Sequence, residues 1–146
     1  MLYTIGFLEK SAETFFDLMR ENQIDLLVDI RLWNATADAG FAKSDDLAYL
    51  LREVAGCDYA YEPTFSPTED LLSGTIAGRY SWEDYQRTYK GLMEGRDMAG
   101  YFFRRYDAVG KNICLLCAEL TAARCHRRLL AEELAAKNPE IEIRHL

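Results

Sequence analysis

The segment CAELTAARCHRR, residues 117–128, combines two thiols, a carboxylate, an imidazole and three guanidinium groups. We expect a helix to begin near Thr121, with the basic residues in its first turns, where unpaired amide N–H groups already create a positive potential. Cations at that end of a helix are mildly destabilising, but converging donors there bind phosphate or carboxylate groups. The pattern predicts either an anion site centred on Arg127 or a solvated face on which Arg124 and Arg128 pair with acids.

Four residues of this segment are candidates for catalysis. Glu119 is the candidate acid or base, because it follows a buried strand and precedes the basic turn. Cys125 is expected at a helix N-terminus among arginines, a setting that lowers the pKa of a thiol and makes it reactive. Cys117 lies two residues before Glu119. His126 is in register with Leu130, so its ring should face the sheet, either assisting the reaction or bonded to a carbonyl as a core histidine.

Thiols and imidazoles also bind metals, but we predict no metal site and no cofactor. Side chains of Cys125 and His126 would point about 100° apart if both residues were helical. We expect all four cysteines to be reduced, since a chain of this length and apolar content does not need disulfides. A further interpretation is that Cys114 and Cys117 are buried small apolar residues of a central strand.

Alternating strands and helices predict a mainly parallel sheet, in which ligands bind beyond the carboxyl ends of the strands. That rule selects Gly6, Arg31, Glu62 and Glu119. Asp29 lies two residues before Arg31 on the same face, so the two either form an ion pair or leave Arg31 to hold an anion. Aromatic residues near a long loop could stack on a planar ligand or pack in the core: Tyr59, Tyr61, Phe65, Tyr80 and Trp82.

The elements that must position these residues follow from apolar periodicity and caps. Expected strands are 2–5, 25–31, 57–61, 111–119 and 141–146. Expected helices follow the N-cap Ser11, cover 45–55 with Ser44 as cap, run from the N-cap Ser81 through Met93, and cover 99–108. A last helix runs from about Thr121 to Lys137, and at most a short helical turn is expected at 68–72. The sequence thus predicts one α/β domain over residues 1–146, with a mainly parallel sheet of about five strands flanked by helices.

The composition narrows the class of partner. A net charge of −7 gives no global attraction for phosphate backbones, so nucleic acid would have to bind through a local basic patch. Apolar runs are far shorter than the roughly 20 residues of a membrane span, and the N-terminus does not resemble a signal peptide. We therefore expect a cytoplasmic protein without membrane contact. A homo-oligomer is compatible with the sequence.

Several motifs resemble the family catalogued as domain of unknown function 488: YTIG at 3–6, LLVDIR at 26–31, FAK at 41–43, and LLCAE followed by CHR. The resemblance covers nearly the whole chain and implies a small prokaryotic-type α/β protein without an established activity. The family pattern continues YTIG with His and Ser, whereas Phe7 and Leu8 stand here. A Leu-Gly-Gly-like turn after the third strand is replaced by residues 64–66. These departures imply a changed substrate or no catalysis if the missing histidine takes part in the chemistry.

Three functions are compatible with these residues. The first is an enzyme acting on a small anionic, nucleotide-like or nucleic-acid-derived substrate, with Arg31 and Arg127 holding the anion, Glu119 as acid or base, and His126 or a cysteine assisting. The residues expected to contact the substrate are Gly6, Asp29, Arg31, Tyr61 and Arg127. The second is a noncatalytic module that binds a nucleotide, a nucleic acid or a partner through the same basic turn. The third is thiol chemistry at Cys117 or Cys125.

Overall fold

One sheet of five parallel strands organises the computed structural model, which describes residues 1–119 and 121–146. The strands are β1 (Leu2–Gly6), β2 (Leu26–Asp29), β3 (Asp58–Tyr61), β4 (Ile113–Cys117) and β5 (Ile143–His145). Their order is β3-β2-β4-β1-β5, and every pairing is parallel. The predicted α/β fold is confirmed. Leu120, which belongs to the segment 117–128, lies outside the described residues.

The central strand β4 ends beside the ends of β1 and β2. All five of its residues are buried and apolar, as expected for a strand covered on both faces. In the register, Gly6 of β1 is paired with Cys117, and Asp29 of β2 is paired with Leu116. The carboxyl ends of three adjacent strands therefore meet at one edge, where parallel α/β sheets bind ligands.

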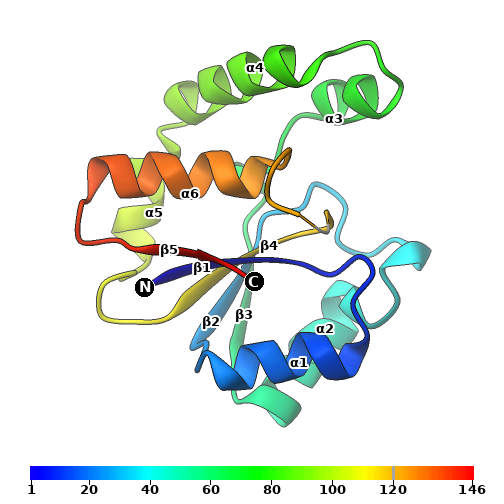
Figure 1. Cartoon of the computed structure of the whole chain (residues 1–146), viewed down its shortest axis with the longest axis vertical. Helices are drawn as coiled ribbons and strands as arrows, with labels where there is room; N and C mark the ends of the chain where they lie inside the picture. Colours follow the sequence, from blue (N-terminus) through cyan, green and yellow to red (C-terminus); the bar gives the residue numbers. More distant parts are fainter. Residues whose placement is uncertain (120) are drawn as a thin grey trace.

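Helices cover both faces of the sheet (Figure 1). One face carries α1 (Ala12–Glu21) and α2 (Ser44–Leu50), which continues into the π-helical turn η2 (Leu51–Ala55). The other carries α5 (Met98–Arg105) and α6 (His126–Lys137), with α4 (Trp82–Gly95) packed on both and α3 (Glu69–Ile76) beside α4. Short 3-10 segments, η1 (Ala37–Ala42) and η3 (Pro63–Phe65), follow β2 and β3. Among the described residues, no helix combines the length and apolarity that crossing a membrane requires.

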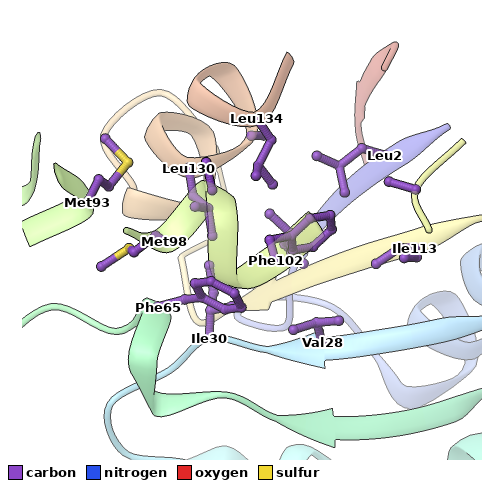
Figure 2. Close-up of a cluster of buried hydrophobic side chains, with 14 of the residues drawn as sticks. Leu2, Val28, Ile30, Phe65, Met93, Met98, Phe102, Ile113, Leu130 and Leu134 are labelled. Carbon is purple, nitrogen blue, oxygen red and sulfur yellow. The ribbon is translucent and has the colours of Figure 1, made fainter. Parts of the chain in front are cut away.

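A buried cluster fixes α6 on the sheet (Figure 2). Leu130 and Leu134 are one helical turn apart and share the face that packs toward Val28, Ile113 and Phe102. All five side chains are fully buried. Burying one such side chain contributes about 1.5–3 kcal/mol to stability. This packing holds the N-terminus of α6 at the carboxyl edge of the sheet.

The start of α6 differs from the prediction. The helix begins at His126 rather than near Thr121, and Cys125 is its N-cap residue in an extended conformation, with φ −139° and ψ 142°. The basic side chains turn back onto the preceding loop, where Arg128 donates a hydrogen bond to the carbonyl of Ala123 and Arg127 donates one to that of Glu119. Guanidinium groups satisfy these carbonyls in place of helical amides, so the chain need not be helical before residue 126.

Smaller differences concern caps and lengths. Lys43 rather than Ser44 is the N-cap residue of α2, and β2 ends at Asp29, two residues earlier than expected. Instead of a short turn at 68–72, α3 is an eight-residue helix whose first turn is capped by Thr68. The predicted N-caps Ser11 and Ser81 are confirmed, because each accepts a hydrogen bond from the backbone three residues later.

Candidate active-site pocket

A pocket of about 520 Å³ opens at the carboxyl edge of the sheet, beyond the ends of β1, β2 and β4. Its walls are mainly apolar, and the bulky members are Phe7, Trp33, Leu72, Ile76, Trp82 and Tyr85. The charged side chains at the pocket are Arg31, Asp38, Glu119 and Arg124. Its lining also includes three buried residues, Cys117, Cys125 and His126. A mainly apolar pocket with a few polar groups is the usual form of a small-molecule site.

Cys117, Cys125 and His126 lie close together although they come from different elements. The imidazole Nδ1 is 3.7 Å from the Cys117 Sγ and 4.0 Å from the Cys125 Sγ. Its Nε2 is 2.9 Å from the carbonyl oxygen of Ile30. A carbonyl only accepts, so Nε2 must carry the proton and donate it. In the neutral ring, the lone pair of Nδ1 therefore faces the two sulfur atoms.

The two thiols of this cluster differ in acidity. Cys117 accepts a hydrogen bond from Cys125, which together with the nearby His126 holds the pKa of Cys117 well below its usual range. Because Cys125 is the donor of that bond and is buried, its own pKa is raised well above the usual range. The sequence predicted the acidic thiol at Cys125, whereas the hydrogen bond between the two thiols favours Cys117 as the acidic one. Burial lowers the pKa of His126, but the Cys117 thiolate outweighs burial and raises it.

The spacing of Cys114 and Cys117 does not make them a ligand pair. Residues three apart on a strand point to opposite faces of the sheet, and Cys114 packs in the core beneath α1. Burial raises the pKa of Cys114 well above its usual range. Cys57 and Cys114 are thus buried small apolar residues, whereas Cys117 lines the pocket.

Arg31 and Asp29 form a buried ion pair. The guanidinium donates from Nε to the Asp29 Oδ1 at 2.8 Å and from Nη2 to Oδ2 at 2.7 Å. Nη2 also donates to the carbonyl of Ala42, and Tyr59 donates its hydroxyl to Asp29 at 2.6 Å. Within the described part of the chain, Nη1 is buried without a hydrogen-bond partner. Of the two alternatives that the spacing allowed for Asp29 and Arg31, the ion pair is present. The Phe7 ring lies 5.3 Å from the Arg31 Cζ.

Arg127 holds the loop after β4 through a hydrogen bond to its backbone and does not line the pocket. Its side chain is only 1% exposed, donates from Nη1 to the Glu119 carbonyl, and lies 3.9 Å from the Cys125 Sγ. Gly6 makes this arrangement possible, since a Cβ at residue 6 would lie 1.6 Å from the Glu119 carbonyl oxygen. The absence of a side chain at Gly6 therefore makes room for the backbone carbonyl of Glu119.

Glu119 and Arg124 are the exposed charged residues on the pocket side of this loop. Arg128, in contrast, forms an ion pair with Glu132 at 3.2 Å and stacks over Trp82, with 5.9 Å between its Cζ and the ring. Of the three arginines in the basic turn, Arg124 is therefore the one whose side chain reaches the pocket. Sequence reasoning ranked Arg127 above it.

Tyr61 and Glu62, at the end of β3, lie outside the pocket lining. Tyr61 donates its hydroxyl to the carbonyl of Leu32 at 2.8 Å. Glu62 is buried, accepts a hydrogen bond from Tyr101 at 2.9 Å and pairs with Arg105 at 3.0 Å. These contacts connect the end of β3 to the segment after β2 and to α5. Among the aromatic residues singled out from the sequence, only Trp82 lines the pocket.

Two aromatic pocket residues were not found by sequence reasoning. Tyr85 lies within the helix expected over residues 81–93, and it lines the pocket. Burial, followed by the neighbouring Cys117 and Cys125, raises its pKa, so the hydroxyl stays protonated at neutral pH. Trp33 lies two residues beyond Arg31 and is 44% exposed at the rim. The sequence did contain a signal for Trp33 as a pocket residue, because it lies just past the end of a predicted strand.

The chain matches the family model described as "Domain of unknown function DUF488" over residues 11–134. No curated protein and no solved structure matches the chain. The matched range contains the ends of β2 and β4 and all three residues of the Cys117, Cys125 and His126 cluster. Since the model spans most of the sequence, the chain belongs to the DUF488 family.

Proposed function

We propose that this protein is an enzyme that acts on a small anionic, nucleotide-like or nucleic-acid-derived ligand bound in the pocket. The observation that carries the proposal is the cluster of two thiols and one imidazole in the lining of a mainly apolar pocket at the carboxyl edge of the sheet. Buried thiols and imidazoles with mutually shifted pKa values are typical of reactive centres.

The pocket walls support a ligand with one planar and one anionic part. Trp33, which is 44% exposed at the rim, offers an aromatic face on which a planar group can stack, while Phe7 and Trp82 line the wall with Arg31 and Arg128 against their rings. Arg124 is exposed at the same pocket and supplies a positive charge to the anionic part. Glu119 is the carboxylate best placed to accept or donate a proton, because it follows Cys117 at the end of β4 and is exposed to the pocket.

A thermal-shift screen tests ligand binding. Phosphate, nucleotides, nucleosides and short oligonucleotides are compared on the wild type, Arg124→Ala and Arg52→Ala; Arg52 is an exposed arginine outside the pocket. A ligand at about 100 times its Kd stabilises the native state by about 2.7 kcal/mol. In a chain of this size that raises Tm by roughly 5–10 °C. The shift should shrink in Arg124→Ala and persist in Arg52→Ala; equal shifts in all three proteins would refute the role of Arg124.

A noncatalytic binding module is the second candidate, favoured by the apolar rim of the pocket, where Trp33 is 44% and Ile76 is 74% exposed. Glu119→Gln separates the two functions. An enzyme should keep its ligand-induced Tm shift in this variant while its turnover of that ligand falls by about 100-fold or more. A ligand that binds the wild type and is never converted would support the binding module instead.

A further inference from the structure

The side chains of Cys117, Cys125 and His126 lie close to the geometry of a zinc site. Typical Zn–S and Zn–N distances with tetrahedral angles place two sulfur ligands about 3.8 Å apart and a sulfur and a nitrogen about 3.6 Å apart. Here the Nδ1 of His126 is 3.7 Å from one Sγ and 4.0 Å from the other. All three ligand atoms lie within 4.8 Å of one another. Shifts of a few tenths of an ångström to about one ångström would complete the coordination geometry.

The groups that contact His126 and Cys125 resemble those that orient metal ligands in known metal sites. A metal-bound histidine usually donates its other ring N–H to a carbonyl or carboxylate, which fixes the ring. His126 does this through Nε2 to the carbonyl of Ile30 at 2.9 Å. On the sulfur side, the Arg127 guanidinium lies 3.9 Å from the Cys125 Sγ and can stabilise a thiolate there. Both contacts come from buried groups that the fold already holds in place.

The argument made from the sequence against a metal site does not hold in the structure. That exclusion assumed that Cys125 and His126 are consecutive helical residues. Cys125 instead precedes α6 in an extended conformation, which turns its Sγ toward the imidazole. Cys117 reaches the same point from the end of β4. The ligands thus come from a strand end, an N-cap and the first residue of a helix.

We propose that Cys117, Cys125 and His126 bind one Zn²⁺ ion whose fourth coordination position faces the pocket. Two thiolates and a neutral imidazole suit Zn²⁺ in ligand type and balance its charge. Three protein ligands with one open position are typical of catalytic rather than structural zinc, and all three line the pocket. A water or the anionic group of the ligand would occupy that position. The role of the ion rests on the proposed function, whereas its binding is measured without any ligand.

Zinc binding is tested on the whole folded chain. The protein is stripped with a chelator under reducing conditions and titrated with Zn²⁺ against a chromophoric competitor; Co²⁺ is added separately to read the visible bands of tetrahedral thiolate coordination. The informative variant is Cys125→Ser, because serine is a favoured N-cap residue and should preserve α6. Cys57→Ser is the matched control, since Cys57 is buried outside the pocket.

We expect one Zn²⁺ per chain in the wild type and in Cys57→Ser, and an affinity at least about 100-fold weaker in Cys125→Ser, more than the loss typical of an outer-contact change. Circular dichroism should show all three proteins folded. Equal zinc affinity in the wild type and Cys125→Ser, or no uptake by the folded wild type, would overturn the site. Rapid alkylation of Cys117 in the presence of excess Zn²⁺ would also overturn it and support thiol chemistry.

The two proposals fail independently. Zinc uptake that depends on Cys125, combined with no response to any compound in the thermal-shift screen, would refute the anionic ligand and leave the metal site in place. A ligand-induced shift that depends on Arg124, in a protein that binds no zinc, would refute the metal site alone.

Discussion

Replacing Gly6 with alanine should destabilise the protein, because no space exists for a Cβ at this position. The added carbon would lie 1.6 Å from the Glu119 carbonyl oxygen and 2.8 Å from the Arg127 Nη1. Side-chain carbons essentially never approach other atoms within 3.0 Å, so the carbonyl must move by at least about 1.4 Å. Such overpacking costs about 1–3 kcal/mol. Weakening the Arg127 hydrogen bond to that carbonyl adds about 1.5–3 kcal/mol, since the donor is charged and buried.

The assay is urea unfolding followed by circular dichroism, with Gly91→Ala as the control. Gly91 lies inside α4, and a Cβ there meets no atom within 4 Å. Alanine in the interior of a helix is more stable than glycine by about 0.5–1 kcal/mol, so this variant should be slightly stabilised. We expect Gly6→Ala to lose about 2.5–6 kcal/mol. A Gly6→Ala protein as stable as the wild type would refute the close packing of β1 against the loop after β4.

Three further predictions concern buried or half-buried polar groups. Asp29→Asn should cost about 3–5 kcal/mol of unfolding free energy, because it leaves the Arg31 charge buried without its partner; a loss below about 1 kcal/mol would contradict this. Burial raises the pKa of Cys57 to about 12, so mass spectrometry should find it unmodified after alkylation of the native protein at about pH 8, and labelled only in urea. Burial, reinforced by the hydrogen bond to Glu62, raises the pKa of Tyr106 to about 12. In the unfolded chain this phenol ionises near pH 10, so the stability that the neutral Tyr106 hydroxyl contributes is complete below about pH 10 and declines toward pH 12. Urea titrations of Tyr106→Phe should show a smaller decline over this range.

The order of elements could be predicted because each depends on local apolar patterning. Apolar runs identified β2 and β4, and alternating apolar residues identified β5. Ser11 and Ser81 identified two helix starts through hydrogen bonds that span only three residues. The start of α6 was missed because it depends on contacts with distant groups. Arg127 bonds a carbonyl eight residues away, beside a glycine from β1. No local pattern in the sequence contains that contact.

The pocket was predicted in position but only partly in composition. The rule that ligands bind at the carboxyl ends of parallel strands correctly selected the region of Arg31 and Glu119, which both line the pocket. It also selected Glu62, whose strand lies at the edge of the sheet and whose carboxylate is used by Tyr101 and Arg105. Strand order decides which ends converge, and that order depends on long-range pairing.

The buried arginines and the exposed one have separate roles, and this decides which variants can report on a ligand. Arg31 and Arg127 hold Asp29 and the Glu119 carbonyl, so they position the end of β2 and the loop after β4, which lie beside the cluster. Removing either charge leaves a buried polar group unpaired, which costs free energy whether or not a ligand is present. Loss of binding in an Arg127 variant therefore says little about anion recognition. Arg124 is exposed at the pocket, and its loss changes the field there while the buried contacts stay in place.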